Sequence, residues 1–122
     1  MGANNGWDDI WVLKTNAAGT IQWKKNYGSS SLEFIASPGC IINTSDGGYI
    51  FIASTTSNDG DVSGFHPGAV VGIPDVWVVK IDNSGNIQWQ KCYGGSGRES
   101  GYTIQQTTDG GYIIGAQSET DG

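Results

Sequence analysis

Two aspartates with oxygen-bearing neighbours stand close together in the longest segment that the sequence does not repeat. Asp59 and Asp61 lie in the stretch NDGDVSG, with Asn58 and Ser63 beside them. Closely spaced carboxylates and amides are the hard oxygen ligands that Ca²⁺ prefers. The stretch lacks the third acid and the closing Glu of an EF-hand loop, so a polar turn held by side-chain hydrogen bonds is the alternative. Asp59 and Asp61 are therefore the candidate metal ligands, and Ca²⁺ is the one cofactor considered.

One histidine and three charged residues are the other candidates for binding or chemistry. His66 follows the two aspartates and has the chemistry of a general base, but it lacks a partner in the sequence and reads more simply as an exposed loop residue. Glu33 and Glu99 occupy equivalent places in a repeat that is described below, and Arg98 precedes the second of them. In a ring these charges would recognise a sugar or a cation near the channel mouth, unless they are ordinary solvated side chains.

Charge and missing motifs argue against several classes of function. The net charge is −6, which repels phosphate backbones and anionic membrane surfaces. No apolar run approaches the roughly 20 residues of a membrane span. No G-x-S-x-G, H-E-x-x-H or phosphate-binding loop occurs in the sequence. We therefore expect neither nucleic acid nor a membrane as a partner, and we expect that the protein is not an enzyme.

The chain that must position these residues is rich in glycine and tryptophan. Its 122 residues include 20 Gly and 5 Trp, and only 15% are charged. Glycine is unfavourable inside helices, whereas aromatic and β-branched residues separated by glycine turns favour short strands. The composition predicts an all-β fold, and the length predicts a single unit over residues 1–122.

The sequence repeats itself once at a nearly constant offset. Trp11 and Trp77 are 77 − 11 = 66 residues apart. Asp46 and Asp109 are only 109 − 46 = 63 apart, so the first copy carries three extra residues, which we place near 37–39. The other pairs at the larger offset are Lys14 and Lys80, Trp23 and Trp89, Tyr27 and Tyr93, Gly28 and Gly94, and Glu33 and Glu99.

Each repeat reads as four strands joined by tight turns. The first repeat covers about 7–60 and the second about 74–122, and a long connection over 55–75 lies between them. In the second repeat the strands are DVWVVKID, NIQWQKCYG, GYTIQQTT and GGYIIGAQS. The Asp109-Gly110 step is a strong hairpin signal, because Gly tolerates a positive φ. Repeated four-stranded antiparallel units favour propeller blades over a β-sandwich, which offers no reason for a repeat.

The amino-acid sequence of the second repeat resembles a known family. The stretch DVWVVKIDNSGNIQWQKCYGGSGRESGYTIQQTTDGGYIIGAQS is similar to secreted bacterial β-propeller repeats with a D-x-W-V-x-K-x-D…Y-G-G-S-G core. KIDNSGNIQW also resembles the Trp-docking motif of quinoprotein-type blades, although the quinone-binding residues of those proteins have no counterpart here. The resemblance implies a β-propeller in which TIQQTT is the inner strand of a blade, followed by GYIIGAQS, VWVVKI and the outer strand NIQWQK. It also implies a secreted or cell-surface location, for which the segment MGANNGWDD offers no signal peptide.

This strand order divides the chain into half a blade (7–28), a complete blade (32–93) and another half (99–122). Two blades cannot close a ring, because closed propellers have roughly four to eight. We expect the C-terminal half-blade of one copy to pair with the N-terminal half-blade of the next in a cyclic homo-oligomer. Three copies would supply six blades and four copies eight. The alternative is a fragment of a larger secreted propeller protein or enzyme.

Several repeated residues are expected to be structural. Trp11, Trp23, Trp77 and Trp89 are expected to pack one blade on the next. Lys14 and Lys80 are expected to make surface or turn contacts. Cys40 and Cys92 occupy unrelated positions without C-x-x-C spacing, so buried thiols are expected in preference to a disulfide.

The function that this sequence favours is a non-enzymatic propeller module that acts as an extracellular interaction scaffold. The first alternative is a lectin-like module that binds glycans at the blade interfaces, where an exposed Trp7 or Tyr102 would stack on a sugar. The second is an enzyme with its site at the central channel, which requires clustered titratable groups on the face of the long connection.

Overall fold

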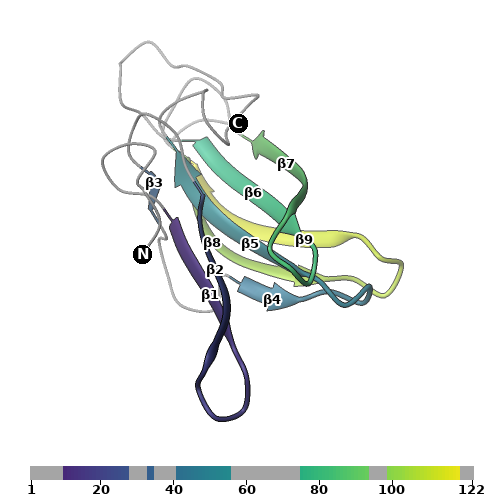
Figure 1. The fold of residues 1–122 in the computed structure, drawn as a ribbon. Helices are drawn as coiled ribbons and strands as arrows, with labels where there is room; N and C mark the ends of the chain where they lie inside the picture. The colour runs from purple at the N-terminus through teal and green to yellow at the C-terminus, as the bar shows by residue number, and fades with distance from the viewer. Residues whose placement is uncertain (1–9, 28–32, 35–40, 56–74, 94–98, 119–122) are drawn as a thin grey trace.

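The described part of the chain is entirely β. The computed structural model describes residues 10–27, 33–34, 41–55, 75–93 and 99–118 (Figure 1). These residues form nine strands in antiparallel pairs, which confirms the predicted all-β class. None of them belongs to a helix that is long and apolar enough to cross a membrane.

The strands form three separate sheets along the chain. β1 (Ile10–Thr15) and β2 (Ile21–Tyr27) make an N-terminal hairpin, and β8 (Glu99–Gln106) and β9 (Tyr112–Ser118) make a C-terminal one. Between them lies a five-stranded sheet of β3 (Glu33–Phe34), β4 (Ile41–Asn43), β5 (Tyr49–Thr55), β6 (Asp75–Ile81) and β7 (Ile87–Tyr93). Its order is β3-β5-β6-β7, and β4 also pairs with β5. This is the predicted order from inner to outer strand, with two strands before it and two after it.

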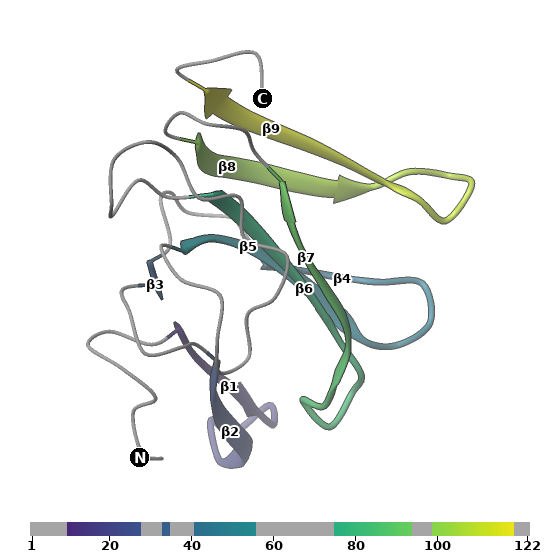
Figure 2. The ribbon, with the colours of Figure 1, turned by 90° about the horizontal axis from the view of Figure 1, so that it is seen from above.

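The middle strands of the central sheet, β5 and β6, are buried on both faces, and their apolar residues occur on both sides of the pleat. Phe51, Trp77 and Val79 pack toward the N-terminal hairpin, where Ile10 and Tyr27 meet them. On the opposite face, the C-terminal hairpin contributes Ile104 to a second cluster, whose other buried members are Ile50, Ile52, Val76 and Val78. Figure 2 shows the three sheets as three successive layers, with the central sheet in the middle.

The inner strand differs between the two repeats. In the second repeat, β8 is a continuous strand of 8 residues with an irregularity between Gly101 and Thr103. In the first repeat the same edge of β5 pairs with two short strands, β3 and β4, which together span residues 33–43. That span is 43 − 33 + 1 = 11 residues, against the 8 residues of β8, so the three extra residues of the first repeat fall between Glu33 and Asn43.

Four hairpin turns have the same backbone conformation at a glycine. Gly19, Gly47, Gly85 and Gly110 have φ angles between 86° and 89°, a conformation in which a Cβ is unfavourable. In every one of these turns the glycine amide bonds to the carbonyl three residues before it. The strand pairing on either side is therefore fixed by turn chemistry that the sequence repeats four times.

Candidate functional site

The contact between the N-terminal hairpin and the central sheet is built by three side chains of β2. Each donates a hydrogen bond to the β6–β7 turn (residues 82–86): Trp23 Nε1 to the carbonyl of Asn83 (2.9 Å), Lys25 Nζ to Asn86 Oδ1 (2.7 Å) and Tyr27 Oη to the carbonyl of Gly85 (2.6 Å). The Trp23 ring lies directly on Gly85, where an added Cβ would be 2.9 Å from the ring. We call this set of contacts the internal junction.

The same three residue types recur in β7 as Trp89, Lys91 and Tyr93, but none of the turns that the structure describes lies against them. Trp89 reaches Tyr112 of the C-terminal hairpin, with 6.0 Å between ring centroids, just as Trp23 reaches Tyr49. Within the described part of the chain, none of the three β7 side chains donates a hydrogen bond. Tyr27 is 2% exposed, whereas Tyr93 is 41% exposed. The side chains of β7, the last strand of the central sheet, therefore form an exposed surface that no described turn covers.

Each of the two terminal hairpins also has an apolar face that is exposed to solvent. Trp77 in β6 is fully buried, whereas its repeat equivalent Trp11 in β1 is 44% exposed. Ile50 in β5 is fully buried, whereas its equivalent Ile113 in β9 is 62% exposed. In both hairpins the exposed residues lie on the face turned away from the central sheet, because the residues alternating with them pack against it.

A buried lysine links two strands inside the central sheet. Lys80 Nζ donates to the carbonyl of Ile81 (3.2 Å) and to Gln88 Oε1 (2.6 Å), and it forms an ion pair with Asp46 Oδ2 at 3.0 Å. Hydrogen bonds from the Thr44 hydroxyl and from Lys80 hold the pKa of Asp46 well below its ordinary value of 3.8. The ion pair joins the β4–β5 turn to β6.

The equivalent lysine in the N-terminal hairpin lacks this carboxylate. Lys14 Nζ donates to the carbonyl of Thr15 and to Gln22 Oε1, both at 2.9 Å, which repeats two of the three contacts of Lys80. The aspartate that corresponds to Asp46 is Asp109, in the β8–β9 turn. Its pKa is lowered by hydrogen bonds from the Thr107 hydroxyl and the Gly111 amide, without a lysine. Within the described part of the chain, Lys14 and Asp109 therefore lack the ion pair that Lys80 and Asp46 form.

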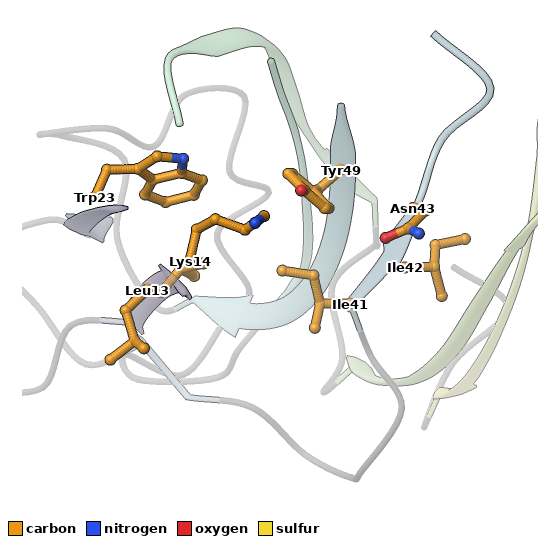
Figure 3. A pocket seen from close by; sticks show the side chains of 8 residues that line it. Leu13, Lys14, Trp23, Ile41, Ile42, Asn43 and Tyr49 are labelled. Carbon is orange, nitrogen blue, oxygen red and sulfur yellow. The ribbon is translucent and has the colours of Figure 1, made fainter. Parts of the chain in front are cut away.

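A hollow of about 200 Å³ lies between the N-terminal hairpin and β4. Figure 3 shows Trp23 and Tyr49 on its walls and Lys14 extending into the space between Trp23 and Ile41. Ile41 is 42% exposed here, whereas its repeat equivalent Ile104 is 1% exposed beneath the central sheet. The hollow exists because the N-terminal hairpin supplies two strands to this interface, whereas the central sheet supplies a full set to the other one.

Most residues selected for chemistry from the sequence lie outside the described part of the chain. This holds for Trp7, Asp59, Asp61, His66 and Arg98, and also for Cys40. The strands β3 and β8 place the backbones of Glu33 and Glu99 at equivalent positions, opposite Thr55 and Ser118, and Tyr102 lies in β8. Among the described residues no group of three or more His, Cys, Asp or Glu side chains could hold a metal ion.

One expectation needs correction and another stays a prediction. Trp11 is expected to pack one blade on the next; it is 44% exposed in the single chain, where no described sheet lies on its outer side, so its packing stays a prediction. Lys80 makes the predicted turn contact from a buried position instead of from the surface. Trp77 is buried, Trp23 packs against the same cluster, and Trp89 contacts Tyr112 but is 39% exposed. Cys92 is a buried thiol, as expected.

Sequence reasoning did not single out Gly19 or Asp109 as contact residues, and it expected only surface or turn contacts of Lys14. The signal was present in the offsets, because each of these residues corresponds to one that makes a contact between strands or sheets elsewhere in the chain.

Comparison with known proteins gives no family for this chain. No protein-family model matches the sequence, and a search of the curated proteins finds no significant match. The interpretation of the site therefore depends on its own geometry.

Proposed function

We propose that the chain is a two-blade unit of a β-propeller, which joins copies of itself head to tail into a closed ring and serves as a non-enzymatic interaction scaffold. The observation that supports this most directly is the contrast between equivalent residues. Side chains that are buried in the central sheet have exposed equivalents on the outer faces of the two terminal hairpins, with Trp77 and Trp11 as the clearest pair. Exposed apolar faces of this kind mark interaction surfaces.

The edges of the outer hairpins support the same proposal. β1 pairs with β2 alone and β9 pairs with β8 alone, so each has one edge without a described partner strand. Unpaired edges are templates for another strand, and a head-to-tail contact closes into a ring when the rotation between copies permits it. A scaffold fits the described residues, since the perturbed carboxylates Asp46, Asp82 and Asp109 are all held by turn hydrogen bonds.

The test is the molar mass of the 122-residue chain, measured by light scattering on a size-exclusion column over a range of concentrations. We expect a fixed mass of three or four chains, corresponding to six or eight blades. A monomer at all concentrations would contradict the proposal and favour a segment of a longer array. A mass that grows with concentration would contradict ring closure and indicate an open filament.

Glycan binding is a second candidate, favoured by the hollow of about 200 Å³ in which Trp23 and Tyr49 face Lys14. An aromatic wall beside a polar donor is a common arrangement for small ligands. Glycan binding requires that this hollow stays accessible to solvent, whereas assembly of copies would cover it. Titration of the chain with mono- and disaccharides, followed by tryptophan fluorescence, would support glycan binding if Trp23→Phe abolished a saturable response that Trp89→Phe retained.

A further inference from the structure

We infer that the partner of the open C-terminal end is the β1–β2 hairpin of a second copy, bound by the same contacts that make the internal junction and the β5–β6 pair. This inference rests on the proposed function and specifies its interface. It is argued from residues whose repeat equivalents already make each contact within one chain.

The strand register of the interface follows from β5 and β6. In the central sheet Tyr49 is opposite Ile81, Phe51 is opposite Val79 and Ala53 is opposite Trp77. The repeat offsets of 63 for β5 and 66 for β6 carry these pairs to β9 and to β1 of the second copy. Tyr112 then lies opposite Thr15, Ile114 opposite Leu13, and Ala116 opposite Trp11. The shared sheet β8-β9-β1-β2 would have the order of the central one.

This register closes the ion pair that each chain leaves open. Lys80 meets Asp46 at 3.0 Å because the β4–β5 turn lies beside β6. With β1 of the second copy beside β9, its Lys14 takes the place of Lys80 and faces Asp109. Lys14 already makes the other two contacts of Lys80, so its ammonium is held near the required position. The charges are complementary across the interface, which favours this pairing over contact between two like ends.

The turn of the second copy also fits the open donors of β7. At the internal junction the acceptors of Trp23 and Tyr27 are the backbone carbonyls of Asn83 and Gly85. The β1–β2 turn (residues 16–20) offers the carbonyls of Ala17 and Gly19 at the equivalent positions, whatever its side chains. Trp89 and Tyr93 would donate to them, and Lys91 would meet Thr20 where Lys25 meets Asn86.

Gly19 is the position that makes this contact specific. Gly85 and Gly19 have the same φ of +86°, but a Cβ at Gly85 would meet the Trp23 ring at 2.9 Å, whereas a Cβ at Gly19 would meet nothing within 4 Å. In the proposed interface the Trp89 ring of the neighbouring copy covers Gly19. A methyl group there would be harmless to the single chain and would obstruct the docking of Trp89.

In the proposed interface, the hollow beside β4 is occupied by a residue of a second copy. Ile104 is covered by Ile50 and its neighbours in β5. Ile113 of a second copy is the equivalent of Ile50, and in the shared sheet it faces Ile41, the equivalent of Ile104. The hollow and the exposed Ile113 are therefore two sides of one contact, and a second copy fits the hollow through continuity with an interface that the chain already contains.

The decisive experiment compares Gly19→Ala with Gly110→Ala. Both glycines have a positive φ and empty space around an added Cβ, so both variants should lose a similar amount of stability. Gly110 corresponds to Gly47, which also has nothing within 4 Å inside the complete sheet, so Gly110→Ala should leave the interface intact. We expect Gly19→Ala to raise the concentration at which half of the chains are assembled by about tenfold or more. Thermal unfolding followed by circular dichroism checks that both variants fold alike.

Crosslinking tests the register independently. In a background with Cys40→Ser and Cys92→Ala, Leu13→Cys with Ile114→Cys places two thiols directly opposite each other, at a separation compatible with a disulfide. Mild oxidation should give disulfide-linked multimers on non-reducing gels. The matched control is Val12→Cys with Ile114→Cys, in which the side chains project from opposite faces of the sheet and should stay unlinked.

The outcomes separate this inference from the function on which it rests. A wild-type chain that stays monomeric overturns both. A wild-type chain that assembles, while Gly19→Ala assembles as readily as Gly110→Ala, overturns the interface and leaves the scaffold proposal standing. Equal crosslinking of the two cysteine pairs overturns the register.

Discussion

Two strands of this chain carry nearly the same side chains in opposite environments. β2 places Trp23, Lys25 and Tyr27 on the β6–β7 turn, whereas none of the described turns lies against Trp89, Lys91 and Tyr93 of β7. The residue types do not decide which set is buried. The neighbouring sheet decides it. An exposed aromatic in a repeat protein can therefore mark a missing neighbour as readily as a ligand site, and the buried equivalent shows which neighbour is missing.

The largest effect in this comparison is expected at the paired tryptophans Trp77 and Trp11. Trp77→Ala should lower the free energy of unfolding by about 3–5 kcal/mol, because it empties a fully buried site against Phe51 and removes a hydrogen bond to Gln90. Trp11→Ala should cost about 1 kcal/mol or less when the chain is dilute and unassembled. Urea unfolding followed by circular dichroism measures both, and equal losses would mean that Trp11 is buried in the single chain.

A smaller contrast is expected between two glycines. Gly85→Ala combines an unfavourable left-handed backbone, worth about 1–2 kcal/mol, with displacement of the Trp23 ring. Gly110→Ala carries the backbone cost alone, because its surroundings are empty. The difference between their unfolding midpoints in urea reports how firmly Trp23 is seated. Identical midpoints would show that the ring moves aside without cost.

Removing one hydroxyl sharpens the comparison further. Tyr27→Phe should lower the free energy of unfolding by about 1 kcal/mol, since it deletes a buried hydrogen bond to the Gly85 carbonyl. Tyr93→Phe should leave the dilute chain unchanged and weaken assembly only. Thermal unfolding at low concentration measures the first effect and light scattering the second. Destabilisation of the dilute chain by Tyr93→Phe would show that this hydroxyl already has a partner.

The smallest effect is expected in the dependence of folding stability on acidic pH. Because the pKa of Asp46 is lower in the folded chain than its ordinary value of 3.8, its stabilising contribution is complete above that value and is lost as the pH falls through the lowered pKa. Asp46→Asn should therefore flatten the acid side of the stability curve. In the dilute, unassembled chain Asp109→Asn should flatten it less, because no lysine contributes there to the lowered pKa of Asp109. Urea unfolding between pH 6 and pH 2 measures the slopes, and a steeper effect for Asp109→Asn would contradict the assignment of Lys80.

Sequence reasoning reached the individual strands, since glycine turns and alternating apolar residues mark them locally, whereas the order of the strands in the central sheet followed from the family resemblance. Asp109-Gly110 predicted its hairpin correctly, and Gly110 has the positive φ that such a turn uses. The ion pair of Lys80 with Asp46 was out of reach, because it depends on which residue of β6 lies beside the β4–β5 turn. The exposure of Trp11 was missed for a related reason, since its residue type and spacing equal those of Trp77. The candidate Ca²⁺ ligands Asp59 and Asp61 lie outside the described residues, so that prediction stands as it was made.

The spacing of the internal junction has a consequence for how such a chain folds. The bonds from Trp23, Lys25 and Tyr27 to the turn join residues 60, 61 and 58 positions apart. Each junction therefore closes a chain loop about one repeat long, at an entropic cost that rises only with the logarithm of the loop length. Because that loop has the same length at every junction, a chain of this type can gain repeats without any closure becoming slower or more costly than the first.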